Sequence, residues 1–278
     1  MKTNNASCII QCYGITKDPE TNNFIMLMFY ADSGSLRQDL NKNFNSMDWR
    51  DKFYILYYIA IGLSEIHKKG LIHQDFHSGN ILTFYNEYYV TDLGLCKPAD
   101  EKTDKNVYGV LPYVAPEALR GKEYTQASDV YGFGIIIYEV FNGLPPYHDM
   151  AHDEFLAVKI CQGLRPKFIT KVPQLLEDIF NQCVDADPLK RPTAEDLCKK
   201  FYQWQDEVRL DKNSGICKQI KEADEFNKKQ PTLTNLSSDT ELTYVTHTQA
   251  IYTSRLLNFM NLPEPKNADD GESDYSGN

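Results

Sequence analysis

The hydrophobic and polar positions of this chain follow two periods, and each period predicts a different kind of element. Two apolar and aromatic runs, Cys8–Thr16 and Asn23–Tyr30, flank the polar turn Lys17–Asn22 and predict a pair of strands. A short helix is expected after Gly34. Residues 49–69 repeat apolar positions every three or four residues, which predicts a long amphipathic helix.

Farther along the chain a hairpin is expected first, and helices after it. Ile81–Phe84 and Tyr88–Thr91, joined by a short polar turn, predict the hairpin. After a loop-like stretch, the spacing predicts helices over residues 131–141, 154–162, 173–184 and 194–204. A little sheet followed by many helices indicates an α+β fold with a much larger helical part.

The composition changes near residue 205. Residues 205–278 carry 8 basic and 13 acidic side chains, and they are rich in Asn, Thr and Ser. Residues 206–229 have weak apolar spacing that could form a charged helix, and beyond them no core-forming period is visible. We therefore expect a folded domain over residues 1–204 and a polar, acidic, largely disordered tail over 205–278.

Charge and composition exclude several classes of protein. The 278 residues have a formal net charge of −10, which disfavours binding to nucleic acid, where affinity comes from clustered Lys and Arg. The sequence has no apolar run long enough to span a bilayer and no apolar leader. Its seven scattered cysteines are typical of reduced thiols in a cytoplasmic protein.

The residues most suited to catalysis lie between positions 73 and 94. Asp75 precedes Asn80 by five residues, and Asp92-Leu93-Gly94 follows the predicted hairpin. A carboxylate and an amide oxygen can hold Mg²⁺ while it keeps several waters. A further carboxylate can accept the proton of an attacking hydroxyl. The spacing therefore favours metal-assisted phosphoryl transfer.

These residues resemble those of a protein kinase. His73-Gln74-Asp75, with Asn80 at the required offset, is similar to the catalytic loop of that family, and Asp92-Leu93-Gly94 is similar to its metal-binding triplet. The resemblance implies that Asp75 and Asn80 are catalytic, that Asn80 and Asp92 hold Mg²⁺, and that His73 is structural. We call residues 73–80 the 73–80 loop and residues 92–117 the activation segment.

Three later motifs extend the resemblance to about residues 6–204. Ala115-Pro116-Glu117 closes the activation segment, and Ser128-Asp129-Val130-Tyr131-Gly132-Phe133-Gly134 resembles the start of the large central helix. Arg191-Pro192, after Asp187-Pro188, resembles the segment that supplies the arginine partner of Glu117. The resemblance implies a structural ion pair between Glu117 and Arg191, and a structural role for Asp129.

The strand before residue 31 resembles the kinase hinge that binds ATP. Met28 corresponds to the residue beside the adenine pocket, and the backbone of Phe29 and Ala31 would face the adenine edge. Leu82 would lie against the adenine face. On this assignment residues 1–31 are strands and hinge of the N-terminal lobe, and residues 32–204 form the C-terminal lobe.

The activation segment also contains possible regulatory positions. Gly94 belongs to the metal-binding triplet, and Thr103 and Tyr108 are candidate phosphorylation sites. Gln74 replaces the arginine that usually pairs with an activation-segment phosphate, so control by such a phosphate is expected to be weak. The hinge and Tyr113–Glu117 look most like the tyrosine-kinase-like group, which acts mostly on Ser and Thr.

Two alternatives stay open at the level of the sequence. Small-molecule kinases of the aminoglycoside and choline type share a His-x-Asp-x-His-x-Gly-Asn motif, although they are not expected to carry the Ala-Pro-Glu segment. In addition, the glycine-rich loop and strand lysine that hold ATP phosphates in the family are absent from these 278 residues. We therefore expect MgATP to bind weakly or not at all. The chain could be an active kinase that acts on a protein substrate. It could equally be an inactive pseudokinase, a scaffold for signalling partners or a truncated gene product.

Overall fold

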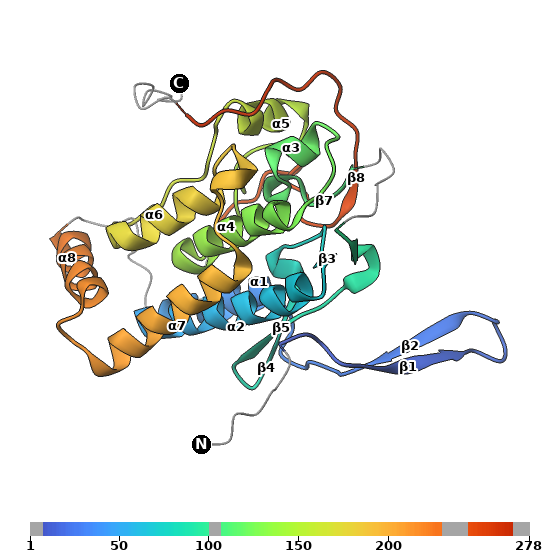
Figure 1. Ribbon diagram of the computed structural model, residues 1–278, viewed down its shortest axis with the longest axis horizontal. Helices are drawn as coiled ribbons and strands as arrows, with labels where there is room; N and C mark the ends of the chain where they lie inside the picture. The colour runs from blue at the N-terminus through green and yellow to red at the C-terminus, as the bar shows by residue number, and fades with distance from the viewer. Residues whose placement is uncertain (1–7, 100–106, 230–243, 269–278) are drawn as a thin grey trace.

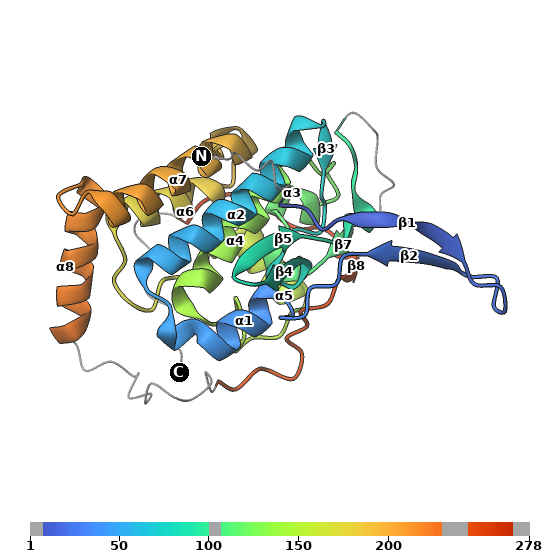
Figure 2. The same ribbon diagram turned by 90° about the horizontal axis from the view of Figure 1, so that it is seen from below.

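The computed structural model describes residues 8–99, 107–229 and 244–268. Within these ranges a body of packed helices carries one long hairpin that projects away from it (Figures 1 and 2). About 48% of the described residues are helical, 3-10 turns included, and the sheets are small. The α+β class expected from the sequence is therefore confirmed.

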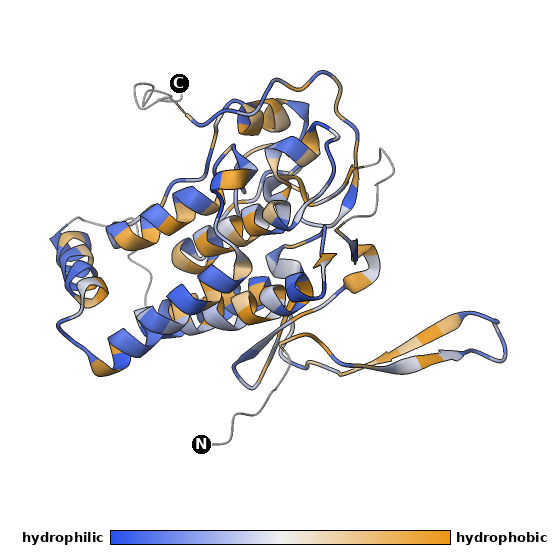
Figure 3. Ribbon diagram, in the orientation of Figure 1, coloured by the Kyte–Doolittle hydropathy of each residue, from blue (hydrophilic) through white to orange (hydrophobic). Residues whose placement is uncertain are grey.

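The projecting hairpin is formed by β1 (Cys12–Lys17) and β2 (Phe24–Met28), which pair antiparallel. Every residue of both strands is exposed, including Phe24 at 78% and Met26 at 56%. Figure 3 shows apolar positions along this hairpin. The predicted strand pair is present, but residues 8–10 do not belong to it, because their backbone bonds to Val90 instead.

The core is built around three long helices. α2 (Trp49–Lys68) packs along α7 (Ala194–Leu210), and α4 (Gln126–Asn142) lies between α2 and α6 (Gln174–Cys183). Every residue of α4 from Ser128 onward is buried, so this helix is enclosed on all sides. The helices predicted over 49–69, 154–162, 173–184 and 194–204 are all present, with shifted ends.

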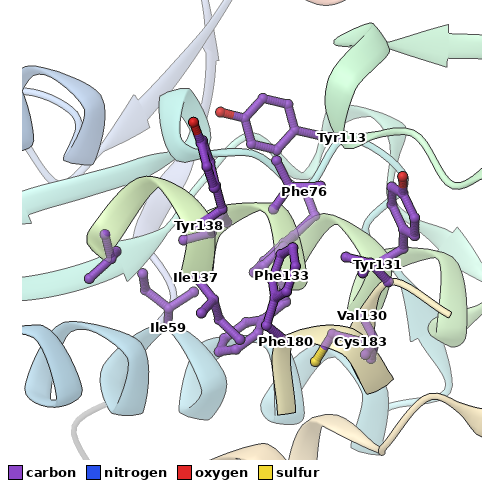
Figure 4. Close-up of a cluster of buried hydrophobic side chains, with 14 of the residues drawn as sticks. Ile59, Phe76, Tyr113, Val130, Tyr131, Phe133, Ile137, Tyr138, Phe180 and Cys183 are labelled. Atoms are coloured by element: carbon purple, nitrogen blue, oxygen red, sulfur yellow. The ribbon is translucent and has the colours of Figure 1, made fainter. Parts of the chain in front are cut away.

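Close packing joins α4 to the 73–80 loop. The rings of Phe133 and Phe76 are stacked, with centroids 6.5 Å apart, at the centre of the cluster in Figure 4. One residue earlier, a Cβ on Gly132 would lie 2.5 Å from the carbonyl oxygen of Phe76. Glycine therefore allows the loop to rest directly on the helix.

The remaining helices are α1 (Leu36–Asn43), α3 (Pro116–Leu119), α5 (Glu154–Cys161) and α8 (Gly215–Lys229). The remaining strands form three antiparallel pairs. These are β3 (Leu71–Ile72) with β6 (Lys97–Pro98), β4 (Ile81–Phe84) with β5 (Glu87–Val90), and β7 (Val107–Gly109) with β8 (Arg255–Leu257).

Two helices extend beyond the ranges expected from their apolar spacing. α4 begins five residues before Tyr131, because Thr125 caps it by accepting a hydrogen bond from the backbone N–H of Ser128, and the polar first turn carries no apolar signal. α7 runs past the expected domain boundary at residue 204 to Leu210.

The range for which a disordered tail was expected contains further described structure. α8 packs against α7, and its Asp224 accepts a hydrogen bond from Trp49 Nε1 at 3.0 Å. Residues 244–268 lie extended over the body and include β8 (Figure 1). Their contacts join positions far apart in the sequence, and amino-acid composition does not predict such contacts.

Two further observations bear on the cellular setting. Across the described ranges, no helix combines the length and apolar content needed to cross a membrane. All seven cysteines carry free thiols.

Candidate active site

One buried carboxylate fixes the base of the 73–80 loop. Asp129, which is 2% exposed, accepts hydrogen bonds from the backbone N–H groups of His73 at 2.8 Å and Gln74 at 2.9 Å. His67 Nε2 lies 2.8 Å from the same carboxylate. Gln74 has a φ of 70°, a strained conformation for a residue other than glycine, and these bonds hold it there.

His73 ties the loop to the strand that leads into the activation segment. Its Nε2 lies 2.9 Å from the carbonyl oxygen of Thr91, and its Nδ1 accepts the backbone N–H of Asp75 at 3.3 Å. The ring is fully buried. His73 therefore carries its proton on Nε2 and orients the backbone of Asp75.

Asp75 is held between two side chains of its own loop. Asn80 Nδ2 donates to the carbonyl oxygen of Asp75 at 3.0 Å and to its carboxylate Oδ2 at 3.3 Å. His77 Nε2 lies 3.5 Å from Oδ1. Because His77 Nδ1 accepts the N–H of Gly79, the neutral imidazole carries its proton on the nitrogen that faces Asp75.

These neighbours keep Asp75 ionised. Burial opposes the charge, but hydrogen bonding by His77, the electrostatic effect of His77, hydrogen bonding by Ser254 and the electrostatic effect of His73 outweigh it. The pKa of Asp75 therefore lies below its ordinary value. A buried carboxylate that stays ionised at neutral pH can accept a hydrogen bond, or a proton, from a hydroxyl placed against it.

Asn80 and Asp92 lie close together because the backbone N–H of Thr91 donates to the carbonyl oxygen of Asn80 at 2.9 Å. Asp92 is exposed, has a φ of 58° and accepts the N–H of Gly94 at 3.4 Å. Among the described residues, no group of three or more His, Cys, Asp or Glu is arranged to hold a metal ion. Amide and carboxylate oxygens from two residues nevertheless suit Mg²⁺, which keeps waters and phosphate oxygens as its other ligands.

The segment expected to be the hinge runs beside β4. Ser35 forms a β-bridge with Leu82, and Phe29 packs its ring edge-on against Phe84 at a centroid distance of 4.8 Å. Met28 is 40% exposed, and Ala31 is half-buried. Ser35 is thus brought to Leu82, and the Phe29 ring to Phe84.

The end of the activation segment is anchored by a buried ion pair. Arg191 Nη1 and Nη2 donate to the two carboxylate oxygens of Glu117 at 2.7 and 2.8 Å. Arg191 also donates to the carbonyl oxygens of Asp185 and Ala127, both at 2.9 Å. The ion pair expected from the resemblance is present, with a bidentate geometry.

Of the two candidate phosphorylation positions, only Tyr108 lies within the described residues. Thr103 lies outside the described residues. Tyr108 is in β7, where its side chain is 41% exposed and its carbonyl oxygen accepts a hydrogen bond from the hydroxyl of Tyr124 at 2.6 Å.

Comparison with known families settles the class of the protein. The sequence model for protein tyrosine and serine/threonine kinases matches residues 1–201 of the chain. The chain belongs to this family. Membership decides against the small-molecule phosphotransferases that the 73–80 loop alone left open.

Individual relatives of this chain are named as serine/threonine or protein kinases. A probable serine/threonine-protein kinase of Dictyostelium discoideum is 30% identical over 181 residues, or 64% of this chain and 11% of that protein. Another probable serine/threonine-protein kinase of that organism, roco5, is 32% identical over 209 residues, or 68% of this chain and 7% of that protein. A protein kinase and PP2C-like domain-containing protein of Arabidopsis thaliana is 28% identical over 243 residues, or 73% of this chain and 37% of that protein. The chain thus matches only a minor part of each relative.

The chain also contains a polar cluster that was not predicted from the sequence. Tyr113 donates its hydroxyl hydrogen to Glu139 Oε2 at 2.6 Å, and Arg37 Nη2 donates to the Tyr113 oxygen at 3.1 Å. Arg37 Nε lies 3.4 Å from Glu139 Oε1. One feature of the sequence does indicate this cluster: Glu139 lies within the otherwise apolar run of residues 135–141, and a buried carboxylate needs a partner.

Proposed function

We propose that this kinase transfers the γ-phosphoryl group of ATP to serine and threonine hydroxyls of a protein substrate. Asp75 orients the acceptor hydroxyl and takes its proton, while Asn80 and Asp92 offer oxygen ligands to Mg²⁺. Bound Mg²⁺ would neutralise charge on the transferred group. Positioning and charge neutralisation are most of what this reaction requires of a protein.

The observation that carries the proposal is the constraint on the Asp75 carboxylate. It is fixed by Asn80 and faced by His77, and the backbone bond from Thr91 to Asn80 keeps Asp92 nearby. A carboxylate held in this way has already lost its conformational entropy before substrate binds, which supports a catalytic rather than a structural role.

Further features support the finer assignments. The bridge between Ser35 and Leu82 and the contact of Phe29 with Phe84 support an adenine site formed by Met28, Phe29, Ala31 and Leu82. The names of the relatives support Ser and Thr as acceptors. Gly34-Ser35-Leu36 and the Tyr113–Glu117 segment support the tyrosine-kinase-like group.

The setting is inferred from charge and thiols. We place the kinase in the cytoplasm, which the seven free cysteines support. A protein substrate or signalling partner fits better than nucleic acid, because the net charge is −10. The division into a kinase unit over residues 1–204 and a tail stays a prediction.

A second candidate function is that of a catalytically inactive binding module. It is favoured by one observation: none of the 15 glycines of the 278 residues forms the Gly-x-Gly-x-x-Gly pattern that holds ATP phosphates in kinases. Under the first proposal, these phosphate contacts must come from residues outside this sequence.

The test compares the 278-residue chain with the same chain joined to the glycine-rich loop, lysine strand and helix of a relative. We expect the chain alone to show no phosphoryl transfer and the joined protein to phosphorylate serine or threonine peptides. Asp92→Asn should abolish that transfer and Asp75→Asn should reduce it severely. Asp211→Asn, an exposed carboxylate outside the site, is the matched control and should have no effect.

One result would decide against the proposal, and another would change only the source of the phosphate contacts. If the joined protein binds MgATP in calorimetry and still transfers nothing, the binding-module function takes its place. If the chain alone transfers phosphate and Asp92→Asn abolishes it, catalysis remains but another group of this chain must hold the phosphates.

A further inference from the structure

The chain's own C-terminal segment adds a strand to the activation segment. β8 pairs antiparallel with β7, with Gly109 opposite Arg255 and Val107 opposite Leu257 (Figures 1 and 2). Leu257 is 5% exposed, so its side chain joins the core. Strand addition of this kind is a common way for proteins to bind an extended peptide.

The register of this pairing brings Ser254 to the Asp75 carboxylate. Gly109 lies next to Asp75, because a Cβ built on Gly109 would be 3.7 Å from Asp75 Oδ1. Its partner Arg255 immediately follows Ser254 in the chain. The register therefore places Ser254 beside this carboxylate.

Tyr252, two residues before Ser254, sits on the buried polar cluster described above. The guanidinium of Arg37 stacks on its ring at 4.6 Å from the centroid, and Arg37 Nη1 donates to its carbonyl oxygen at 3.2 Å. The Tyr252 hydroxyl donates to the carbonyl oxygen of Pro146 at 2.8 Å. The aromatic side chain therefore has a defined site.

His152 binds the segment on both sides of Ser254. Its Nδ1 lies 2.9 Å from the carbonyl oxygen of Ile251, and its ring packs edge-on against Tyr252 at a centroid distance of 4.8 Å. Its carbonyl oxygen accepts a hydrogen bond from Arg255 Nη2 at 2.5 Å. His152 is 2% exposed, so these contacts are made from within the body.

Contacts beyond β8 show that the segment is docked along its length. Arg120 Nε donates to the carbonyl oxygen of Leu262 at 3.1 Å, and Lys266 N donates to the carbonyl oxygen of Cys161 at 2.9 Å. Asn267 Oδ1 accepts the N–H of Ala186 at 2.8 Å. The segment thus follows a continuous path over α3 and α5 (Figure 1).

We propose that the tail strand, residues 251–257, fills the acceptor-peptide site of this kinase in cis and places Ser254 where a substrate hydroxyl belongs. That this site receives acceptor peptides rests on the proposed function. That the tail strand occupies it rests on the contacts alone. The site takes an extended peptide with an aromatic residue two positions before a hydroxyl residue and an arginine directly after it. While the tail strand is bound, other peptides are excluded.

Hydrogen exchange of the full 278-residue chain, read by mass spectrometry without nucleotide, tests the occupancy. We expect protection of the backbone amides at 107–109 and 255–257. Tyr252→Ala and Arg255→Ala should each speed exchange at both places by at least about tenfold, while α4 amides stay unchanged. Val245→Ala, a tail residue that is 88% exposed, is the matched control and should change nothing.

A fluorescent peptide with the sequence of residues 248–262 tests whether the site can be filled in trans. The Tyr252→Ala/Arg255→Ala chain should bind it at least about tenfold more tightly than the unaltered chain, because the resident strand no longer competes. A peptide carrying the same two substitutions should not bind.

The proposal is overturned if the amides at 255–257 exchange as fast in the unaltered chain as in the free peptide. It is equally overturned if both chains bind the peptide with the same affinity. Neither measurement uses ATP, so a failure here is distinct from a failure of phosphoryl transfer. Protection and peptide binding without any transfer would support the occupancy and reject only the catalytic role.

Discussion

Glu117 and Asp75 are equally buried, but we expect them to contribute very differently to stability. Their exposed fractions are 5% and 4%. Glu117→Ala leaves the Arg191 guanidinium, whose side chain is 0% exposed, without its carboxylate partner. A guanidinium cannot shed its proton to reduce the cost, because it remains charged at any ordinary pH.

The magnitudes follow from what each substitution leaves behind. Breaking a buried ion pair from one side costs about 3–5 kcal/mol. Asp75→Ala leaves His77, which can stay neutral, and Asn80, which keeps its 3.0 Å bond to the backbone carbonyl of residue 75. The loss there is about one hydrogen bond, roughly 0.5–1.5 kcal/mol.

Thermal and urea unfolding of the full chain near pH 7 measure the difference. At about 2–4 °C per kcal/mol for a domain of this size, Glu117→Ala should lower Tm by roughly 6–20 °C and Asp75→Ala by only a few degrees. The urea m value should stay constant for both variants. In a double-mutant cycle, Glu117→Ala/Arg191→Met should recover much of the loss, because neither charge remains buried.

Equal melting shifts for Glu117→Ala and Asp75→Ala would refute this reasoning. So would a double variant that loses the sum of the two single effects, since that result means no coupling between Glu117 and Arg191. Either result would mean that the bidentate geometry contributes little to the anchoring of the activation segment.

Three further predictions concern the tail, the core and the thiols. Burial, together with two nearby arginines, lowers the pKa of His152 below 6.5. The contribution of His152 to stability is therefore full above pH 6.5 and is lost as the pH falls. The difference in Tm between the unaltered chain and His152→Gln should narrow in acid, and a constant difference would contradict this. Gly132→Ala should cost roughly 1–3 kcal/mol, because the added Cβ would meet the carbonyl oxygen of Phe76, and an unchanged urea midpoint would show that the loop can shift freely. Iodoacetamide should label exposed Cys12 well before Cys161, whose pKa burial raises to about 11; peptide mass spectrometry with equal labelling of both would count against the buried position.

The sequence alone determined much of the fold and the identity of the site. The three-to-four spacing over residues 49–69 is a local property of α2, and the helix appears where it predicts. The five-residue interval from Asp75 to Asn80 and the resemblance of Glu117 and Arg191 to a known pair each pointed to a contact that the structure contains.

Only the tertiary structure decided which side chains surround that site. Arg37 and Glu139 lie far apart in the chain and carry no shared motif, yet they meet under the activation segment. The docking of residues 251–257 was not decided by the sequence either, because the polar composition of the tail as a whole predicts disorder unless distant groups supply partners. Those partners, Arg37 and His152, come together only when the helices pack. Periodicity and local motifs reflect interactions between neighbours in sequence, whereas the docking of residues 251–257 depends on contacts that exist only in the assembled body.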